Sequence, residues 1–309
     1  MVPLAEVRPT AAIPDATRPE ARARRVREES AKGLILARSA TAGLALASVA
    51  FLLNISVLGR MVHWSAQTRE YAQFRKEVAF GTAPVGPLDR SGRLLHSGSP
   101  VALLEVPVLH LHEVVGEGTS SDVLMSGPGH LRSTVLPGQA GTSVILGRAA
   151  AYGGPFGNLG HVPVGSRITT TTGAGTVTFK VIDVREAGSA LPPPLVSGQA
   201  RLTLVSAAGM AFLPDGVVKV DADAEGQVEP AAPLAVTSVP RGEQPMGTST
   251  GGLFALALLL EALIVVVGCA TWGWFAWGLA RTWVIAAPVT VLLGCYISAR
   301  VMSLVPNLV

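Results

Sequence analysis

Two hydrophobic patterns divide the chain into membrane and extramembrane parts. Residues 39–59, 253–271 and 280–303 are long apolar runs, whereas residues 101–222 contain short β-branched runs broken by glycine and proline. A helix of about 20 apolar residues crosses the ~30 Å hydrocarbon core of a bilayer. The pattern therefore predicts three transmembrane helices and a mainly β domain.

The β domain is predicted at residues 101–222. Gly173-Ala-Gly175 is a hairpin turn signal between two of its strands. Many short strands at this spacing favour a closed or nearly closed barrel, although the pattern alone leaves a sandwich open. The candidate strands are Val101–Val108, Thr142–Leu146, Arg167–Thr172, Thr176–Val184, Arg201–Ser206 and Gly216–Ala222.

Two segments connect this domain to the apolar runs. Residues 60–100 are predicted to form a stalk helix and linker, because Tyr71, Phe74 and Val78 recur at helical spacing before a region rich in glycine and proline. Residues 223–252 are rich in Ala, Pro, Gly, Ser and Thr. They are predicted to be a second linker.

The N-terminal segment carries the chain's positive charge. Residues 1–38 hold eight Lys+Arg and five Asp+Glu and are rich in Ala, Arg and Pro, which predicts a disordered tail. The positive-inside rule then puts this tail in the cytoplasm and the β domain outside. A cleaved signal peptide is the competing reading, but the basic region is too long and Gly59-Arg60-Met61 is a poor cleavage site. An uncleaved signal anchor is the favoured prediction.

Composition excludes several other classes of protein. A mean hydropathy of +0.45 is too high for an ordinary soluble protein. Residues 59–250 hold 14 Lys+Arg and 15 Asp+Glu, so they lack the basic stripe that nucleic acid requires. We therefore expect no nucleic-acid partner.

The two cysteines, Cys269 and Cys295, lie inside the apolar runs. The β domain thus has neither a disulfide nor a thiol nucleophile, and no cofactor is predicted. His110 and His112 alternate on a predicted strand and could share a metal, but no third ligand is evident. We predict no metal site and read both as solvent-facing.

The β domain contains several short motifs: Leu104-Glu-Val-Pro107, Glu117-Gly-Thr119, Gly127-Pro-Gly-His130, Leu136-Pro-Gly-Gln139, Gly147 with Tyr152-Gly-Gly-Pro-Phe156, and Leu202-Thr-Leu-Val-Ser-Ala207. Together these motifs resemble the sortases, most of all the membrane-anchored class E sortases of actinobacteria. Sortases cut a sorting-signal peptide with a cysteine and pass the acyl group to an amine, assisted by a histidine and an arginine. The resemblance covers about residues 82–222 and implies a sortase-like β-barrel.

All three catalytic positions of the family are changed here. The resemblance puts Arg148 in place of the histidine and Ala207 in place of the cysteine, with Asp215 or Gly216 about where the arginine belongs. A guanidinium with a pKa above about 12 cannot act as acid or base near neutral pH. Lys219 is the nearest cation but is expected to be out of register. We therefore predict a pseudoenzyme without catalytic residues.

The resemblance also implies a substrate groove on the barrel. Because no catalysis is predicted, we expect this groove to bind a ligand without transforming it. Arg148, Tyr152, Phe156 and His130 are the candidate binding residues, since arginine suits a carboxylate or an extended peptide. A structural hydrogen bond is the other reading of His130. The loop Leu191-Pro-Pro-Pro-Leu195 is either a preset groove wall or a rigid surface turn.

One carboxylate lies inside an apolar run that is predicted to cross the membrane. Glu261 follows Leu258–Leu260 and precedes Ala262–Val267, where an unpaired charge is costly. It marks either a face for a partner protein or second copy, or a group paired or protonated within this chain. We predict a multi-pass membrane protein that acts as a binding or assembly subunit for a membrane or cell-envelope partner.

Two alternatives stay open. One is an active transpeptidase or envelope hydrolase that uses unfamiliar residues such as Ser206 and His161. Adjacent strand residues face opposite ways, however, so the Ser206 hydroxyl should point away from the groove. The other is a structural stalk whose groove binds nothing.

Overall fold

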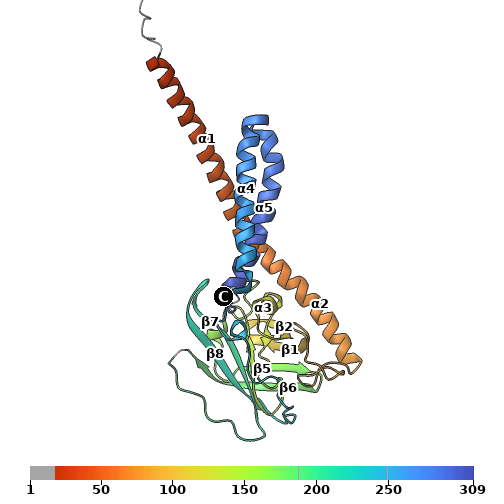
Figure 1. Ribbon diagram of the computed structural model, residues 1–309. Coiled ribbons are helices and arrows are strands. Elements are labelled where there is room, and N and C mark those ends of the chain that lie inside the picture. The colour runs from red at the N-terminus through yellow and green to blue at the C-terminus, as the bar shows by residue number, and fades with distance from the viewer. Residues whose placement is uncertain (1–17, 187, 249) are drawn as a thin grey trace, which may run out of the picture.

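The computed structural model describes residues 18–186, 188–248 and 250–309, and its central feature is a closed β-barrel (Figure 1). Around the barrel the strands within these residues follow the order β1-β2-β3-β4-β7-β8-β6-β5. Neighbouring strands are parallel at β2/β3 and β4/β7 and antiparallel elsewhere. The strands are β1 (Pro100–Val106), β2 (Leu111–Glu117), β3 (Gly129–His130), β4 (Gly141–Leu146), β5 (Arg167–Thr172), β6 (Gly175–Arg185), β7 (Ala200–Met210) and β8 (Leu213–Glu225).

Alternation along β7 and β8 separates a buried inner face from an outer face. Leu202 and Leu204 on β7 and Val218 and Val220 on β8 belong to the main apolar core. Burying one such side chain contributes about 1.5–3 kcal/mol. Strand periodicity therefore places the intervening residues, among them Ala207, on the outside of the barrel.

The outer face changes from polar to apolar along β7. At the start of the strand Arg201 pairs with Asp223 on β8, with Nε and Oδ1 2.6 Å apart. Two residues on, Thr203 donates a 2.7 Å hydrogen bond to Asp221, which also accepts from Arg185 on β6. Val205 and Ala207 follow and belong to a small apolar cluster. This apolar end of the outer face is where the predicted site lies.

The helices lie outside the barrel. In Figure 1, α4 and α5 rise side by side from the end of the barrel beside β7, and α1 runs obliquely next to them. Short 3₁₀ turns occur at Pro107–Leu109, Leu159–His161, Arg241–Glu243 and Thr250–Gly252. The longer elements are α1 (Arg18–Leu53), the π-helical segment Asn54–Leu58, α2 (Gly59–Ala79), α3 (Ser121–Ser126), α4 (Leu253–Trp277) and α5 (Leu279–Leu304).

The prediction of three transmembrane helices is corrected by the structure. Within the described residues, α4 and the segment Arg281–Leu304 of α5 are the two helices long and apolar enough to cross a membrane. The predicted span 39–59 contributes an apolar α-helical run of only 14 residues, Ala40–Leu53. The helix then changes to π geometry at Asn54, whose side-chain amide donates to Ser298 Oγ on α5 at 2.8 Å.

The predicted disordered tail also differs in part. Residues 18–38 are helical and continue into the apolar part of α1, consistent with the high helix propensity of alanine and arginine. Residues 1–17 lie outside the described residues. The remainder of α1 packs against both long helices, with Gly43 next to Val267 and Gly294 next to Ala50.

The predicted stalk helix is present as α2, but it is docked on the barrel. The Gln67 side chain accepts from the Val114 N–H at 2.7 Å and donates to the Val114 carbonyl at 3.1 Å. His63 Nε2 lies 2.8 Å from Glu113 Oε1, and Phe74 is buried. The helix is therefore packed against the barrel and is not a free stalk.

A carboxyl group on α2 should make the stability of this contact depend on pH. Burial raises the pKa of Glu70 from 4.5 to about 7; Glu113 adds to the rise, and His63 and Arg69 oppose it. Between these two pKa values the folded protein binds more protons than the unfolded chain, so stability falls as pH rises from about 4.5 to about 7.

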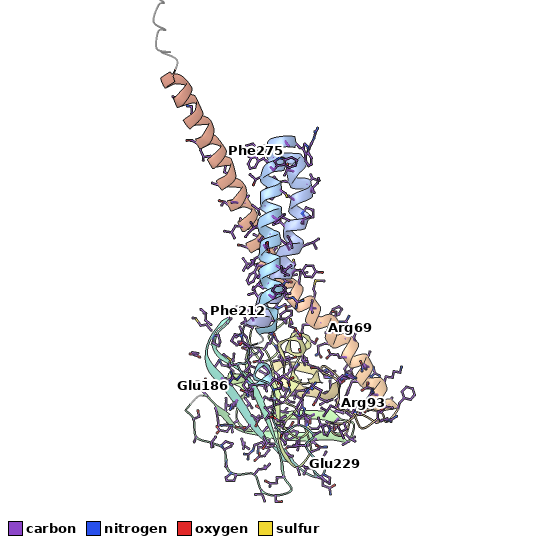
Figure 2. The ribbon with its side chains drawn as sticks, in the orientation of Figure 1. Arg69, Arg93, Glu186, Phe212, Glu229 and Phe275 are labelled. Atoms are coloured by element: carbon purple, nitrogen blue, oxygen red, sulfur yellow. The ribbon has the colours of Figure 1, made fainter. Side chains whose placement is uncertain are left out.

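Glu70→Gln is therefore expected to raise the melting temperature at pH 8 and to have little effect at pH 4.5. Thermal unfolding of the full chain in a mild detergent, followed by circular dichroism, tests this. Glu186→Gln, on the far side of the barrel from α2 (Figure 2), is the matched control and should show no such pH-dependent gain. An equal effect of Glu70→Gln at both pH values would contradict the assignment.

Candidate functional site

Arg148 lies immediately beyond β4, at the point where the barrel meets the helices. Its main chain is fixed by Gly147, whose N–H donates to the Val205 carbonyl at 3.0 Å. A Cβ on Gly147 would lie 2.5 Å from the Phe156 ring, so no larger residue fits between them. The constrained backbone at Gly147 thus fixes the position from which the Arg148 side chain extends.

The Arg148 guanidinium is fully buried and bound on two sides. Nη1 donates to the Val309 carbonyl oxygen at 2.8 Å, and Nη2 donates to Ser121 Oγ at 2.7 Å. Its central carbon lies 5.4 Å from the centre of the Tyr152 ring. Burial lowers the pKa of Arg148 to about 10, while Tyr152 and Asp122 oppose the shift. The group is therefore still a cation near neutral pH and cannot exchange protons there.

Ala207 lies on the outer face of β7 within the apolar cluster. Its methyl group belongs to the shell around Leu124, Leu146, Val205 and Leu308. An alanine side chain has no atom that could attack a carbonyl carbon or hold an acyl group. The neighbouring Ser206 points to the inside, is fully buried and donates to the Gly147 carbonyl at 3.1 Å.

The strand opposite Ala207 supplies no cation at the same level. Ala207 pairs with Val217, and Val205 pairs with Lys219. Gly216 pairs with Ala208, one step nearer the hairpin tip, and Asp215 lies at the register shift that follows between Ala208 and Gly209. Lys219 therefore shares the outer face of Ala207, two residues further from the tip than Val217.

The other predicted binding residues are structural in this conformation. Phe156 is part of the main core. His130 is buried, with Nδ1 2.9 Å from Glu117 Oε2 and Nε2 2.9 Å from the Val135 carbonyl. Tyr152 is buried against Arg148 and has a positive φ of 51°. In this conformation His130 and Phe156 are both buried, and neither side chain lines an open groove.

The residues named for alternative chemistry are not brought together. His161 is exposed at the end of a 3₁₀ turn, and within the described part of the chain no hydrogen bond joins it to Ser206. His110 lies in a left-handed turn before β2, whereas His112 is on β2 and faces Glu105, so they do not share a strand face. Among the described residues there is no group of three potential metal ligands.

The feature that the sequence did not indicate is a segment after α5 that covers the site. Asn307, Leu308 and Val309 are buried against the barrel, where the C label of Figure 1 lies beside β7. The Ala149 N–H donates to the Leu308 carbonyl at 2.8 Å. Because these contacts join residues more than 150 positions apart, no local pattern could have predicted them.

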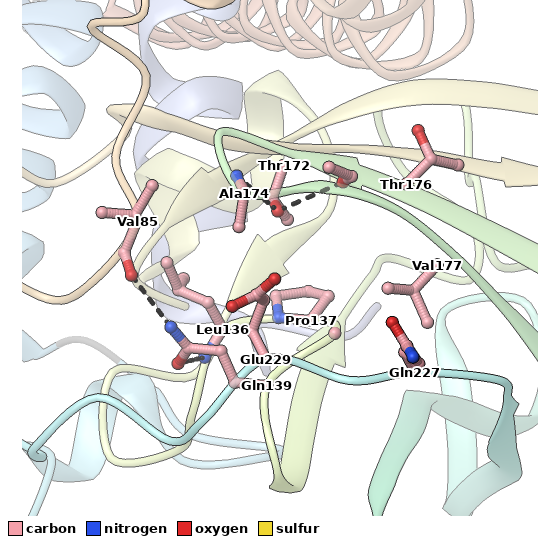
Figure 3. A pocket seen from close by; sticks show the side chains of 12 residues that line it. Val85, Leu136, Pro137, Gln139, Thr172, Ala174, Thr176, Val177, Gln227 and Glu229 are labelled. Atoms are coloured by element: carbon pink, nitrogen blue, oxygen red, sulfur yellow. Dashed lines mark hydrogen bonds between the residues drawn. The ribbon is translucent and has the colours of Figure 1, made fainter.

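A separate cavity lies between the loop before β4 and the β5/β6 hairpin (Figure 3). It has a volume of about 90 Å³ and is lined by Val85, Gln139, Thr172 and Glu229, among others. The Gln139 amide donates to the Val85 carbonyl at 2.9 Å and accepts from the Leu136 N–H at 3.2 Å. Gln139 therefore holds the segment that contains Val85 against the barrel. Both the donor and the acceptor of its side-chain amide already have hydrogen-bond partners.

Comparisons with known proteins gave one family-model match and a set of similar solved structures. Residues 104–208 match the family model of the sortase domain. The solved structures similar to this chain include a Clostridium perfringens sortase D5 transpeptidase, with 19% identity over 52% of this chain and 99% of that chain and a TM-score of 0.43. Sortase C-1 from Actinomyces oris is also similar, with 25% identity over 41% of this chain and 75% of that chain and a TM-score of 0.37.

A comparison with curated proteins gave no match. The evidence for the family is thus the matched segment, which runs from β1 into β7 and includes both Arg148 and Ala207. This chain carries a sortase-like domain.

Proposed function

We propose that this protein is a membrane-attached, class E-like sortase homologue that has lost catalysis and acts as a binding or assembly subunit for a membrane or cell-envelope partner. The observation that supports the proposal is that Ala207, which the resemblance puts at the family's nucleophile position, packs in the same apolar cluster as the buried Leu308 side chain. Without a thiol at position 207 no thioacyl intermediate forms there, and the Arg148 cation cannot take the histidine's part in proton transfer.

Orientation is part of the proposal. The barrel lies outside the cell, as in sortases, and α4 and α5 are the two segments that cross the membrane. Residues 253 and 304 both lie at the barrel end of the α4–α5 hairpin, so two crossings return the chain to the side of the barrel (Figure 1). The segment after α5 then lies on the same side of the membrane as the barrel and can contact it.

The partner-binding face in the membrane is centred on Glu261. This carboxylate is exposed about a third of the way along α4 and has no hydrogen-bond or ion-pair partner among the described residues. Leu258, Ile264 and Val265 are exposed beside it. Because an isolated carboxylate is costly in hydrocarbon, a polar group from another membrane helix is the chemistry that this face requires.

The test is a transpeptidation assay with the full chain in mild detergent. A labelled LPxTG-type sorting-signal peptide and an amine acceptor are the substrates, and an active sortase is the positive control. We expect neither cleavage nor transfer above the peptide alone. Turnover by the wild type that is lost in Ser206→Ala or His161→Ala would establish the alternative of an enzyme with unfamiliar residues and would overturn the proposal.

A further inference from the structure

The segment that follows α5 is held like a bound peptide. The Asn307 amide donates to the carbonyls of Thr119, Gly242 and Gln244 at 3.0, 3.3 and 3.0 Å. Its own N–H donates to the Gly247 carbonyl at 2.9 Å. The Asn307 side chain therefore binds three main-chain carbonyl groups from two separate loops.

The next two residues are held by the barrel itself. The Leu308 carbonyl accepts from the Ala149 N–H, and the Val309 carbonyl accepts from Arg148 Nη1, both at 2.8 Å. The Leu308 side chain is fully buried in the cluster that includes Val205 and Ala207. Main-chain hydrogen bonds combined with a side-chain pocket are the usual way in which proteins recognise an extended peptide.

Space remains next to Val309. A cavity of about 100 Å³ lies beside Val309 and is lined by Ala149, Ala207, Gly209 and Pro214, among others. It continues the outer face of β7 toward the hairpin tip. A longer peptide on the same path would therefore find further room along the strand.

We propose that residues 305–309 are a resident, exchangeable ligand of the groove over Ala207. The groove would then bind an extended peptide of the same chemistry, with a side-chain amide followed by an aliphatic residue, and a partner's peptide would enter only when the resident segment leaves. This inference rests on the proposed function, because it makes the groove a binding site. It also couples the groove to the membrane helices, since Leu304 ends α5 directly before the segment.

Tethering gives the resident segment an advantage over a free peptide. A ligand joined by a short linker has an effective concentration in the millimolar range. A free peptide of the same sequence should therefore bind the wild type at least about 10-fold more weakly than it binds a protein whose segment has been displaced.

The experiment measures binding of a fluorescent Leu-Val-Pro-Asn-Leu-Val peptide, the sequence of residues 304–309, to the full chain in mild detergent by fluorescence anisotropy. Leu308→Asp should displace the resident segment and increase affinity at least 10-fold, whereas Leu308→Met should keep the segment bound and leave affinity low. A peptide with aspartate in place of its second leucine should bind neither variant. Circular dichroism shows whether each variant is folded.

A cross-linked variant makes the result independent of the folding of Leu308→Asp. Ala207→Cys combined with Leu308→Cys places two thiols in the same cluster, and oxidation should lock the segment and abolish peptide binding. Reduction by dithiothreitol should restore binding to at least the wild-type level. Equal peptide binding by the oxidised and reduced forms would overturn the proposal, as would a folded Leu308→Asp variant without a gain in affinity.

This result is separate from the test of the proposed function. Cleavage or transfer of a sorting-signal peptide would contradict the loss of catalysis while leaving the competition between free and resident peptide measurable. Absence of competition would instead make residues 305–309 a permanent strap and leave the non-catalytic reading unaffected.

Discussion

Asp221→Ala is expected to reduce the free energy of unfolding by about 3–5 kcal/mol, because it leaves a largely buried guanidinium without its partner. The side chains of Arg185 and Asp221 are only 12% and 1% exposed, and Nε of Arg185 donates to Asp221 Oδ2. Asp221 also accepts the Thr203 hydroxyl. The substitution therefore breaks an ion pair and a hydrogen bond on the outer face of β7 and β8.

The matched control is Glu225→Ala, further along the same strand. Glu225 pairs with Arg167 at 3.0 Å, but the Glu225 and Arg167 side chains are 37% and 71% exposed. An exposed pair of this kind contributes 0 to about 1 kcal/mol. Urea unfolding of the full chain in mild detergent, followed by circular dichroism, measures both variants. Similar losses for the two substitutions would show that burial does not control the strength of these pairs.

The sequence predicted the β domain well wherever side chains alternate. Leu202 and Leu204 are buried on one face and Arg201 and Thr203 pair on the other, as a half-buried strand requires. β3 was missed because two residues, Gly129 and His130, are too few for any periodicity. Its pairing comes from β2 and β4, which lie on either side.

The candidate site was predicted in position but not in environment. Motif spacing put Arg148 at the end of β4, where the structure has it. Spacing could not show that its guanidinium is covered by Val309, which is 161 residues away. The prediction of an open groove was therefore incomplete, since what fills it depends on the path of the chain after two long helices.

Membrane segments were predicted from composition, and one of the three differs for a geometric reason. The prediction of a span at residues 39–59 rested on the absence of charged residues over a sufficient length. Asn54 interrupts this run, and its side chain finds Ser298 on α5. A polar contact between helices thus decides where the α-helical part of the run ends, and that contact depends on tertiary structure.

His130→Ala distinguishes a structural histidine from a ligand-binding one. The His130 and Glu117 side chains are only 2% and 4% exposed and lie 2.9 Å apart. Removing the ring leaves the buried Glu117 carboxyl group without this partner, and breaking a buried pair costs about 3–5 kcal/mol. We expect a loss of this size in urea unfolding of the full chain.

His112→Ala is the control, because it breaks a second histidine–glutamate pair that is exposed. His112 Nε2 lies 3.2 Å from Glu105 Oε1, and the two side chains are 52% and 41% exposed. Its loss should cost at most about 1 kcal/mol. If His130 instead contacted a ligand of the groove, His130→Ala in the Leu308→Asp background would weaken binding of the Leu-Val-Pro-Asn-Leu-Val peptide while leaving stability near that of the parent. The burial of His130 beneath the loop that carries Val135 favours the opposite outcome, in which stability falls and the affinity of the folded fraction is unchanged.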